Sequence, residues 1–203
     1  MTVVVGITGG IGSGKTTLSQ HLKKRGYSVH ESDRVVSDMY NNPNEGFVKF
    51  IKKNISAEVV KKNKINKKEI TNIIFNNKKT KTKLEKYIHK EVRSCRERFI
   101  KKNTKAKKSI IFADIPLLLE NKLEKSFDLV VSIISSKKNR TKRVLKSKKF
   151  TKETLKRIFK AQTSDKERRM RSQIIIYNNK TKKDFISNAN KALICFLKLK
   201  TKK

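Results

Sequence analysis

The sequence predicts an α/β fold in which a parallel sheet is flanked by helices. Three observations favour this fold: short β-branched runs separated by helical stretches, a glycine-rich loop after the first run, and acidic residues after later runs. All seven glycines lie in the first 46 residues, so glycine is concentrated where that loop needs it. In such a sheet, ligands bind at the carboxyl ends of the strands.

The first predicted strand covers residues 3–7, a nearly continuous β-branched run that is typical of a strand buried on both faces. A helix is predicted over residues 16–24, directly after the glycine-rich loop. Four further strands are predicted from similar apolar runs, at residues 27–30, 109–113, 129–134 and 174–177.

Residues 9–16 satisfy the phosphate-loop pattern G-x-x-x-x-G-K-[ST], with a predicted strand before them and a helix after them. Backbone N–H groups of such a loop point at phosphates, and the helix start adds partial positive charge. We expect Lys15 to bridge the β- and γ-phosphates and the Thr16 hydroxyl to bind Mg²⁺. The sequence therefore predicts the P-loop nucleoside triphosphate hydrolase fold. The loop residues expected to bind the nucleotide are Gly10, Ile11, Gly12, Ser13, Gly14, Lys15, Thr16 and Thr17.

The length of 203 residues indicates one P-loop domain with additions rather than two independent domains. The predicted core covers residues 1–40, 106–140 and 172–203. Apolar residues at helical spacings predict a helical, substrate-binding insertion over residues 41–105. Residues 141–171 form a basic stretch with a helix capped by Thr151, which is typical of a mobile lid.

The net charge is +36, from 53 Lys and Arg residues against 17 Asp and Glu residues. The excess consists mainly of lysine without interleaved aromatic residues, so we expect general attraction of anionic substrates and no dedicated nucleic-acid partner. No run of 18 apolar residues and no signal-peptide pattern is present. We therefore expect a cytoplasmic protein without a membrane partner. We also expect a monomer.

Several segments together resemble the dephospho-coenzyme A kinase family: residues 8–15, Glu31-Ser32-Asp33, residues 114–120 and Gln162. The Pro-Leu-Leu-x-Glu pattern within residues 116–120 discriminates this family, because GTPases, ATPases and many kinases share a bare P-loop. The resemblance implies an enzyme that uses ATP to phosphorylate the ribose 3′-hydroxyl of dephospho-coenzyme A. This is the last step of coenzyme A biosynthesis, and it implies ATP, dephospho-coenzyme A and Mg²⁺ as partners.

The resemblance also implies roles for single residues, each with a structural alternative. Asp33 would hold or deprotonate the acceptor hydroxyl, and its alternative is a helix N-cap. Arg143 would contact ATP phosphates, and its alternative is a solvated position on a helix. Asn178 would lie near the adenine or simply form a turn. Asp114 is a candidate Mg²⁺ ligand or a cap or turn residue.

The expected substrate-binding residues are Thr8, Asp33, Lys67, His89 and Leu118. His89 matches a family His-Pro pair in which lysine here replaces the proline, and a structural position on a helix is its alternative. Departures from the family pattern stand at Glu31, Lys67, Ser147, Gln173 and Lys180. We expect these to change affinities rather than abolish the chemistry. Two other classes stay open: another nucleoside or nucleotide kinase, and a nucleic-acid-stimulated ATPase.

Overall fold

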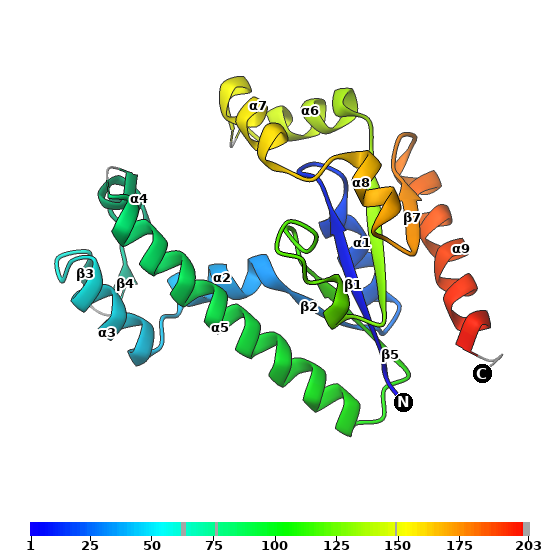
Figure 1. Ribbon diagram of the computed structural model, residues 1–203, viewed down its shortest axis with the longest axis horizontal. Coiled ribbons are helices and arrows are strands. Elements are labelled where there is room, and N and C mark those ends of the chain that lie inside the picture. Colours follow the sequence, from blue (N-terminus) through cyan, green and yellow to red (C-terminus); the bar gives the residue numbers. More distant parts are fainter. Residues whose placement is uncertain (62–63, 76, 149, 201–203) are drawn as a thin grey trace. The chain divides into compact units, whose positions relative to one another are not determined.

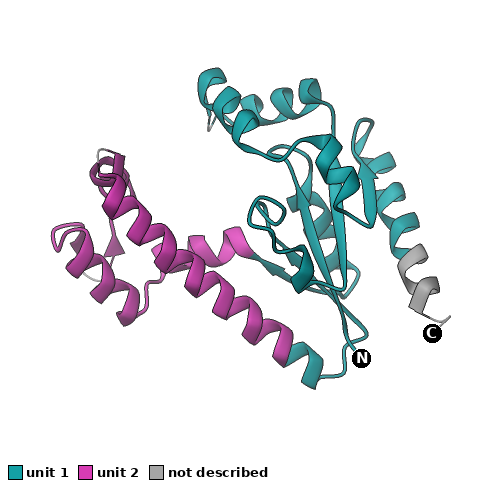
Figure 2. Cartoon of the chain, in the orientation of Figure 1, with its two compact units in different colours: residues 1–31, 102–203 teal, residues 32–101 magenta. Residues whose placement is uncertain are grey.

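Figure 1 shows the computed structural model, which describes residues 1–61, 64–75, 77–148 and 150–200, with side chains described up to residue 193. The end of the predicted core, residues 201–203, lies outside this range. The chain divides into two compact units (Figure 2). Unit 1 comprises Met1–Glu31 and Lys102–Lys203, and unit 2 comprises Ser32–Lys101, where we predicted an insertion over residues 41–105.

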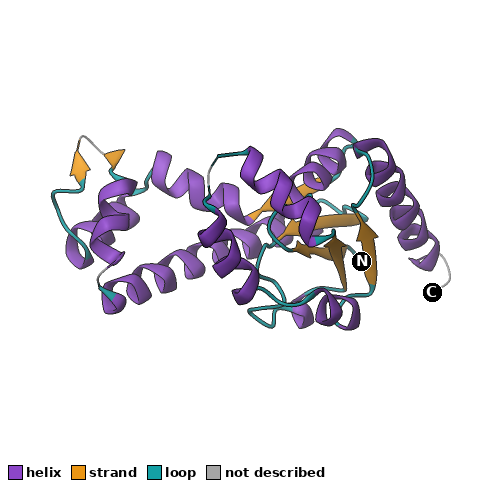
Figure 3. Ribbon diagram, turned by 90° about the horizontal axis from the view of Figure 1, so that it is seen from above, coloured by secondary structure: helices purple, strands orange, loops and turns teal. Residues whose placement is uncertain are grey.

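Unit 1 is built on a five-stranded sheet in the order β2-β5-β1-β6-β7, with every neighbouring pair parallel. Each strand coincides with a predicted one, so the predicted α/β fold is confirmed (Figure 3). The central strand is β1, whose residue Val5 pairs with Phe112 on one side and Leu129 on the other. The strands are β1 (Val3–Gly9), β2 (Ser28–Glu31), β5 (Ile110–Asp114), β6 (Leu129–Ile134) and β7 (Ile174–Tyr177).

Three helices of unit 1, α6, α7 and α8, begin at residues whose side chains accept a hydrogen bond from a backbone N–H of the first turn. Thr151 caps α7 as predicted, because its side chain accepts a hydrogen bond from Thr154 N. Ser164 and Glu167 form a capping box at α8. The helices of unit 1 are α1 (Lys15–Lys24), η1 (Glu124–Ser126), α6 (Lys137–Lys146), α7 (Lys152–Ala161), α8 (Asp165–Met170) and α9 (Lys182–Lys200).

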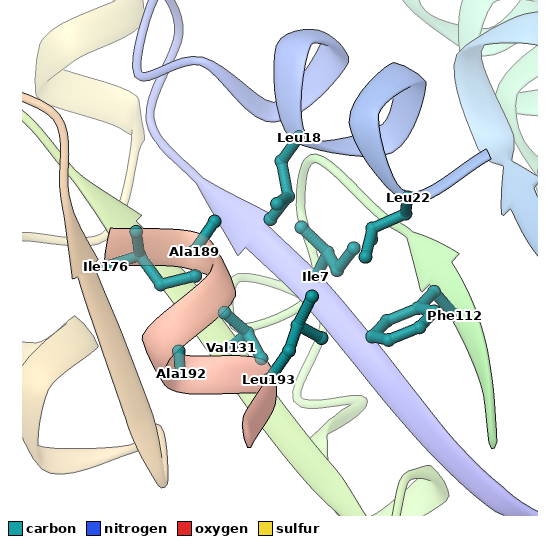
Figure 4. A pocket seen from close by; sticks show the side chains of 9 residues that line it. All are labelled: Ile7, Leu18, Leu22, Phe112, Val131, Ile176, Ala189, Ala192 and Leu193. Atoms are coloured by element: carbon teal, nitrogen blue, oxygen red, sulfur yellow. The ribbon is translucent and has the colours of Figure 1, made fainter. Parts of the chain in front are cut away.

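Apolar side chains cover both faces of the sheet, because neighbouring strand residues point to opposite faces. On one face, side chains from the sheet, α1 and α9 point toward one another around a small apolar cavity lined by Ile7, Leu18, Leu22, Phe112, Val131, Ile176, Ala189, Ala192 and Leu193 (Figure 4). Ala113 and Val130, which are sequence neighbours of Phe112 and Val131 in β5 and β6, point to the opposite face. They belong to a second apolar cluster with Ile115, Leu118 and Leu119. The segment that follows β5 therefore closes the other face.

Unit 2 has its own apolar cluster, made of Phe47, Ile51, Val59, Ile65, Ile70 and Leu84. Aromatic rings pack beside it, with the Phe50 and Tyr87 ring centroids 4.2 Å apart. Its elements are α2 (Ser32–Asn41), α3 (Glu45–Asn54), β3 (Val60–Lys61), β4 (Lys64–Ile65), α4 (Lys67–Phe75) and most of α5 (Lys78–Lys105). Helix α2 contacts β4 of this unit, which explains why unit 2 begins at Ser32. Among the described residues, no helix combines the length and the apolar character needed to cross a membrane.

Close packing at β1 gives a first prediction. A methyl group on Gly6 would lie 2.6 Å from Leu118 Cδ1 and 3.0 Å from Phe127 Cγ. We expect Gly6→Ala to lower the free energy of unfolding by about 1–3 kcal/mol, because overpacking displaces neighbouring side chains. Urea denaturation measures this change. The control is Gly46→Ala, where the nearest atoms are 3.4 Å away and stability should be unchanged or slightly higher. Equal stability of the two variants would contradict the prediction.

Candidate active site

The phosphate loop starts at the carboxyl end of β1 and leads directly into α1. Gly14 is the N-cap of α1 with a φ of 115°, a left-handed conformation that favours glycine. Ordinary side chains would strain the loop at this point. The positive end of the α1 dipole lies at this point of the loop, which suits an anion. The Thr16 side chain is exposed in the first turn of α1.

Lys15 folds back along the loop that precedes it. Its Nζ donates hydrogen bonds to the carbonyl oxygens of Gly9 at 2.8 Å and Gly10 at 3.4 Å. The ammonium group is thereby held over the first half of the loop. A lysine in this position supplies the positive charge that β- and γ-phosphates require.

Asn178, directly after β7, fastens the loop from behind. Its Nδ2 donates to the carbonyl oxygen of Ser13 at 2.7 Å, and its backbone N–H donates to Ile134 O at 2.9 Å. The residue is only 7% exposed, so these hydrogen bonds are sheltered from water. Asn178 thus supports the loop, which is neither of the two roles considered from the sequence.

Arg143 of α6 reinforces the same support. Its guanidinium donates to Gly12 O at 3.3 Å, to Ser135 Oγ at 3.1 Å, and to Asn178 at both O (3.0 Å) and Oδ1 (3.2 Å). Backbone and side-chain oxygens of unit 1 therefore use the fork that we expected to grip phosphates. In this structure Arg143 holds the loop in shape, and it is not the solvated arginine of the alternative.

Two side chains that our list of site residues omitted cover the outer surface of the loop. Gln162, at the C-terminal end of α7, accepts a hydrogen bond from Ile11 N through Oε1 at 3.0 Å. A side chain at Gly10 would collide with Nη1 of Arg140, which belongs to α6. Gln162 is one of the residues on which the family resemblance rests, so the sequence could have indicated it. No sequence pattern indicated Arg140, because only the fold brings α6 beside the loop.

Asp114 and Thr16 are the residues that suit a metal ion. Asp114 is the last residue of β5, and its Oδ2 accepts a hydrogen bond from Ser19 Oγ at 2.9 Å. Ser19 lies one turn after Thr16 in α1, so the carboxylate lies beside the start of that helix. Carboxylate and hydroxyl oxygens fit Mg²⁺, which is usually held by few protein ligands together with phosphates and waters. The described residues contain no group of three or more His, Cys, Asp or Glu suited to a metal.

Acidic residues also follow β2. Glu31 ends this strand and forms an ion pair with Lys23 of α1. Its register partner is Asp114, so the carboxyl ends of β2 and β5 lie at one edge of the sheet. Asp33 is the second residue of α2, with an exposed side chain inside the first helical turn rather than at the N-cap position. Negative charge is favourable in that turn.

The other predicted substrate residues are scattered. Thr8 and Leu118 are fully buried; Thr8 Oγ1 donates to Pro116 O at 3.3 Å, and Leu118 packs in the core. Neither side chain therefore presents a surface to a substrate. Lys67 and His89 are exposed residues of unit 2, and Lys67 Nζ lies 5.0 Å from the centre of the Tyr40 ring.

Glu120, the end of the Pro-Leu-Leu-x-Glu segment, fixes the turn between α7 and α8. Its Oε1 accepts hydrogen bonds from Thr163 N at 2.9 Å and from the fully buried Arg168 at 3.0 Å. Burial opposes the ionised form of Glu120, but the Thr163 hydrogen bonds and the Arg168 charge outweigh it, so the pKa lies below its ordinary value. The turn that carries Gln162 is thereby tied to the segment after β5.

Two of the departures from the family pattern have structural roles. Ser147 is the C-cap of α6, and its Oγ donates to Val144 O at 2.7 Å. Gln173 Oε1 accepts a hydrogen bond from Val130 N at 2.8 Å. Both side chains therefore bond to the protein backbone.

The support of the loop gives a second prediction. We expect Arg143→Lys to keep the positive charge but lose most of the four hydrogen bonds, since an ammonium group lacks the planar fork. ATP affinity should fall about tenfold and the free energy of unfolding by about 1–3 kcal/mol. Calorimetric titration and urea denaturation measure the two effects. Lys142→Ala, an exposed change of charge on the same helix, is the control. An Arg143→Lys protein with the control's ATP affinity would refute the supporting role.

Comparisons with known proteins agree with this arrangement. The family model described as dephospho-CoA kinase matches residues 3–184. The chain is 29% identical over 198 residues to the dephospho-CoA kinase of Fusobacterium nucleatum, covering 93% of this chain and 96% of that protein. It is 28% identical over 185 residues to the Streptococcus mutans dephospho-CoA kinase, covering 89% and 91%.

Solved structures show the same fold. The structure of TT1252 from Thermus thermophilus aligns with a TM-score of 0.80 at 24% identity, covering 97% of this chain and 98% of that chain. The dephospho-CoA kinase from Campylobacter jejuni aligns with a TM-score of 0.72 at 25% identity, covering 95% and 96%. The shikimate kinase from Acinetobacter baumannii shares the fold with a TM-score of 0.54 at 15% identity, covering 98% and 96%. Because the family model matches residues 3–184 of the 203, this chain belongs to the dephospho-CoA kinase family.

Proposed function

We propose that this chain carries out the family reaction at the phosphate loop of unit 1. The reaction transfers the γ-phosphate of ATP to the ribose 3′-hydroxyl of dephospho-coenzyme A and completes coenzyme A. The observation that carries the proposal is a phosphate loop supported by Asn178 and Arg143, in a chain whose family match extends over residues 3–184. A bare loop would suit many nucleotide-binding proteins. The family match indicates which acceptor is phosphorylated, namely dephospho-coenzyme A.

Backbone N–H groups of residues 10–17 would hold the triphosphate, as expected of a phosphate loop that leads into a helix. Lys15 would leave the carbonyl oxygens of Gly9 and Gly10 for the β- and γ-phosphates. Asn178 and Arg143 would act indirectly, by keeping the loop in its phosphate-binding shape.

Mg²⁺ is the metal that we propose for this site. The Thr16 hydroxyl and the Asp114 carboxylate, directly or through water, would hold it at the start of α1. When bound, the ion neutralises phosphate charge and draws the triphosphate into one orientation. Ser19 would orient Asp114 for this role, because its hydroxyl already donates to Oδ2.

Asp33 is our candidate for the residue that handles the acceptor hydroxyl. It follows β2 at the second position of α2, and its carboxylate is exposed. A carboxylate there would accept the hydroxyl proton or hold the oxygen in line with the γ-phosphorus. Phosphoryl transfer depends mainly on such positioning, since its transition state is loose.

Lys67 and His89 remain candidates for the acceptor side because both are exposed in unit 2. We propose that the insertion over residues 41–105 supplies acceptor-binding residues and that residues 141–171 serve as a lid over the nucleotide. Thr8 and Leu118 are not retained for the acceptor, because both are fully buried. The monomeric state and the cytoplasmic location stay predictions from the sequence.

A panel of acceptors tests the reaction. With ATP as donor, we expect dephospho-coenzyme A to give the highest kcat/KM, and we expect a coupled assay for ADP together with mass spectrometry to show one added phosphate. Nucleosides and nucleotides are the competing acceptors, and DNA and RNA are tested for stimulation of ATP hydrolysis. Dominant turnover of another acceptor, or hydrolysis stimulated by nucleic acid, would overturn the proposal.

Asp33→Asn tests the handling of the hydroxyl. The amide keeps the size of the side chain but cannot take a proton, so we expect kcat to fall by about 10²–10⁴-fold with little change in ATP affinity. Steady-state kinetics and calorimetric titration measure the two quantities. The control is Asp38→Asn, which removes another exposed carboxylate of α2, one that pairs with Arg34 at 3.8 Å. If both variants keep the original kcat, Asp33 has no catalytic role.

A further inference from the structure

Arg140 is a largely buried cation that lies against the phosphate loop within unit 1. It belongs to α6, and its side chain is only 11% exposed. Nη1 occupies the space that a side chain at Gly10 would need. Since a lone buried guanidinium is costly, its position over the loop requires partners or a function.

A row of alternating charges holds Arg140 in place. Nη2 lies 3.6 Å from Asp165 Oδ2, and Asp165 Oδ1 lies 4.0 Å from Arg168 Nε. Arg168 in turn binds Glu120 at 3.0 Å. The Arg140 guanidinium also lies 5.0 Å from the centre of the Phe159 ring, a cation–π distance. These contacts fix the direction of the guanidinium, so little side-chain entropy remains to be lost when an anion binds.

The side-chain oxygen of Gln162 binds the loop beside Arg140. Gln162 Oε1 accepts a hydrogen bond from Ile11 N at 3.0 Å, and it would lie 3.3 Å from a Cβ added to Gly10. Arg140 Nη1 would lie closer still to the same Cβ. Backbone N–H groups of this loop are the donors expected to bind phosphate oxygens. A phosphate oxygen that replaced the Gln162 amide oxygen would therefore lie beside the Arg140 guanidinium.

Lys15 indicates which phosphates these would be. Its Nζ lies at the carbonyl oxygens of Gly9 and Gly10, the stretch that Arg140 also covers. The lysine of a phosphate loop serves the β- and γ-phosphates. Two cations thus lie at the stretch of the loop where the β- and γ-phosphates are expected.

Arg143 already has other partners in this structure. Its four hydrogen bonds run to oxygens of Gly12, Ser135 and Asn178, and a move toward phosphates would release the support of the loop. Arg140 instead has its Nη1 beside Gly10 of the loop. A donor that an anion on the loop could reach therefore belongs to Arg140.

We propose that Arg140 binds the terminal phosphates of ATP directly and that Asp165 is its positioning residue. The guanidinium donates hydrogen bonds to nonbridging oxygens of the β- and γ-phosphates and stabilises the charge that develops on them during transfer. Gln162 leaves Ile11 N when the phosphate binds. The inference rests on the proposed function in taking ATP as the phosphate donor.

Three variants test this assignment. Arg140→Ala should raise the dissociation constant for ATP and lower kcat/KM for ATP, each about ten- to a hundredfold, the range for losing hydrogen bonds to a charged group. Arg140→Lys should recover part of the loss, because it keeps the charge but not the fork. Asp165→Asn should cause a smaller loss of kcat/KM, since Arg140 remains but is less firmly held. The KM for dephospho-coenzyme A should stay unchanged in all three.

Nucleotide selectivity separates binding from a purely structural role. Calorimetric titrations with ATP and ADP should show that Arg140→Ala loses most of the preference for ATP. Partial unfolding would instead reduce the apparent binding of ATP and of ADP equally. Lys142→Ala, an exposed change on the same helix, should leave ATP and ADP binding as in the original chain. The proposal fails if Arg140→Ala matches Lys142→Ala. If Arg140→Ala does not fold, full ATP selectivity in Arg140→Lys and in Asp165→Asn refutes it.

The titrations also keep this proposal apart from the proposed function. ATP binding is measured without any acceptor, so a chain that phosphorylates another acceptor would refute the reaction but leave the Arg140 result intact. Conversely, normal turnover of dephospho-coenzyme A with unchanged ATP selectivity in Arg140→Ala would refute the Arg140 assignment alone.

Discussion

The phosphate site depends on the side-chain amide of Asn178. A glycine-rich loop has much conformational freedom to lose, so its shape must be fixed from outside. Asn178 does this by donating to Ser13 O while its own oxygen atoms accept from Arg143. Because the amide is buried, these bonds are stronger than they would be in water, and they connect β7, α6 and the loop. Nucleotide binding then starts from a loop that is already formed.

A second polar connection joins the segment after β5 to the rest of unit 1. Pro116 O accepts from Thr8, Leu118 fills the space over Gly6, and Glu120 binds Thr163 N and Arg168. The Pro-Leu-Leu-x-Glu segment is therefore a structural joint, although it distinguishes a family of enzymes. Its importance for the reaction is indirect, since it places the turn that follows Gln162 and the helix that carries Asp165.

The two arginines of α6 differ in how they contact the phosphate loop. Arg143, which the resemblance marked, donates to Gly12 O and to Asn178, whereas Arg140, which no motif marked, lies beside Gly10. Both lie on one helix three residues apart, so their spacing alone does not tell which side of the loop each will contact. That depends on how α6 is rotated against β6 and the loop, which long-range packing decides. Asn178 and Ser19 gained their roles in the same way, through partners far away in the sequence.

The five parallel strands, the phosphate loop and the family could be predicted from the sequence, because they follow from local patterns: β-branched runs, clustered glycines and a contiguous motif. The sequence did not foresee the start of α2 at Ser32 or the short β3–β4 pair, whose two-residue strands leave no periodic signal. Long-range packing, in contrast, buries Thr8 and Leu118, joins Asn178 to Ser13 and places Arg140 beside Gly10. Burial and hydrogen bonding at these residues depend on partners more than a hundred positions away, and no local pattern encodes such a pairing.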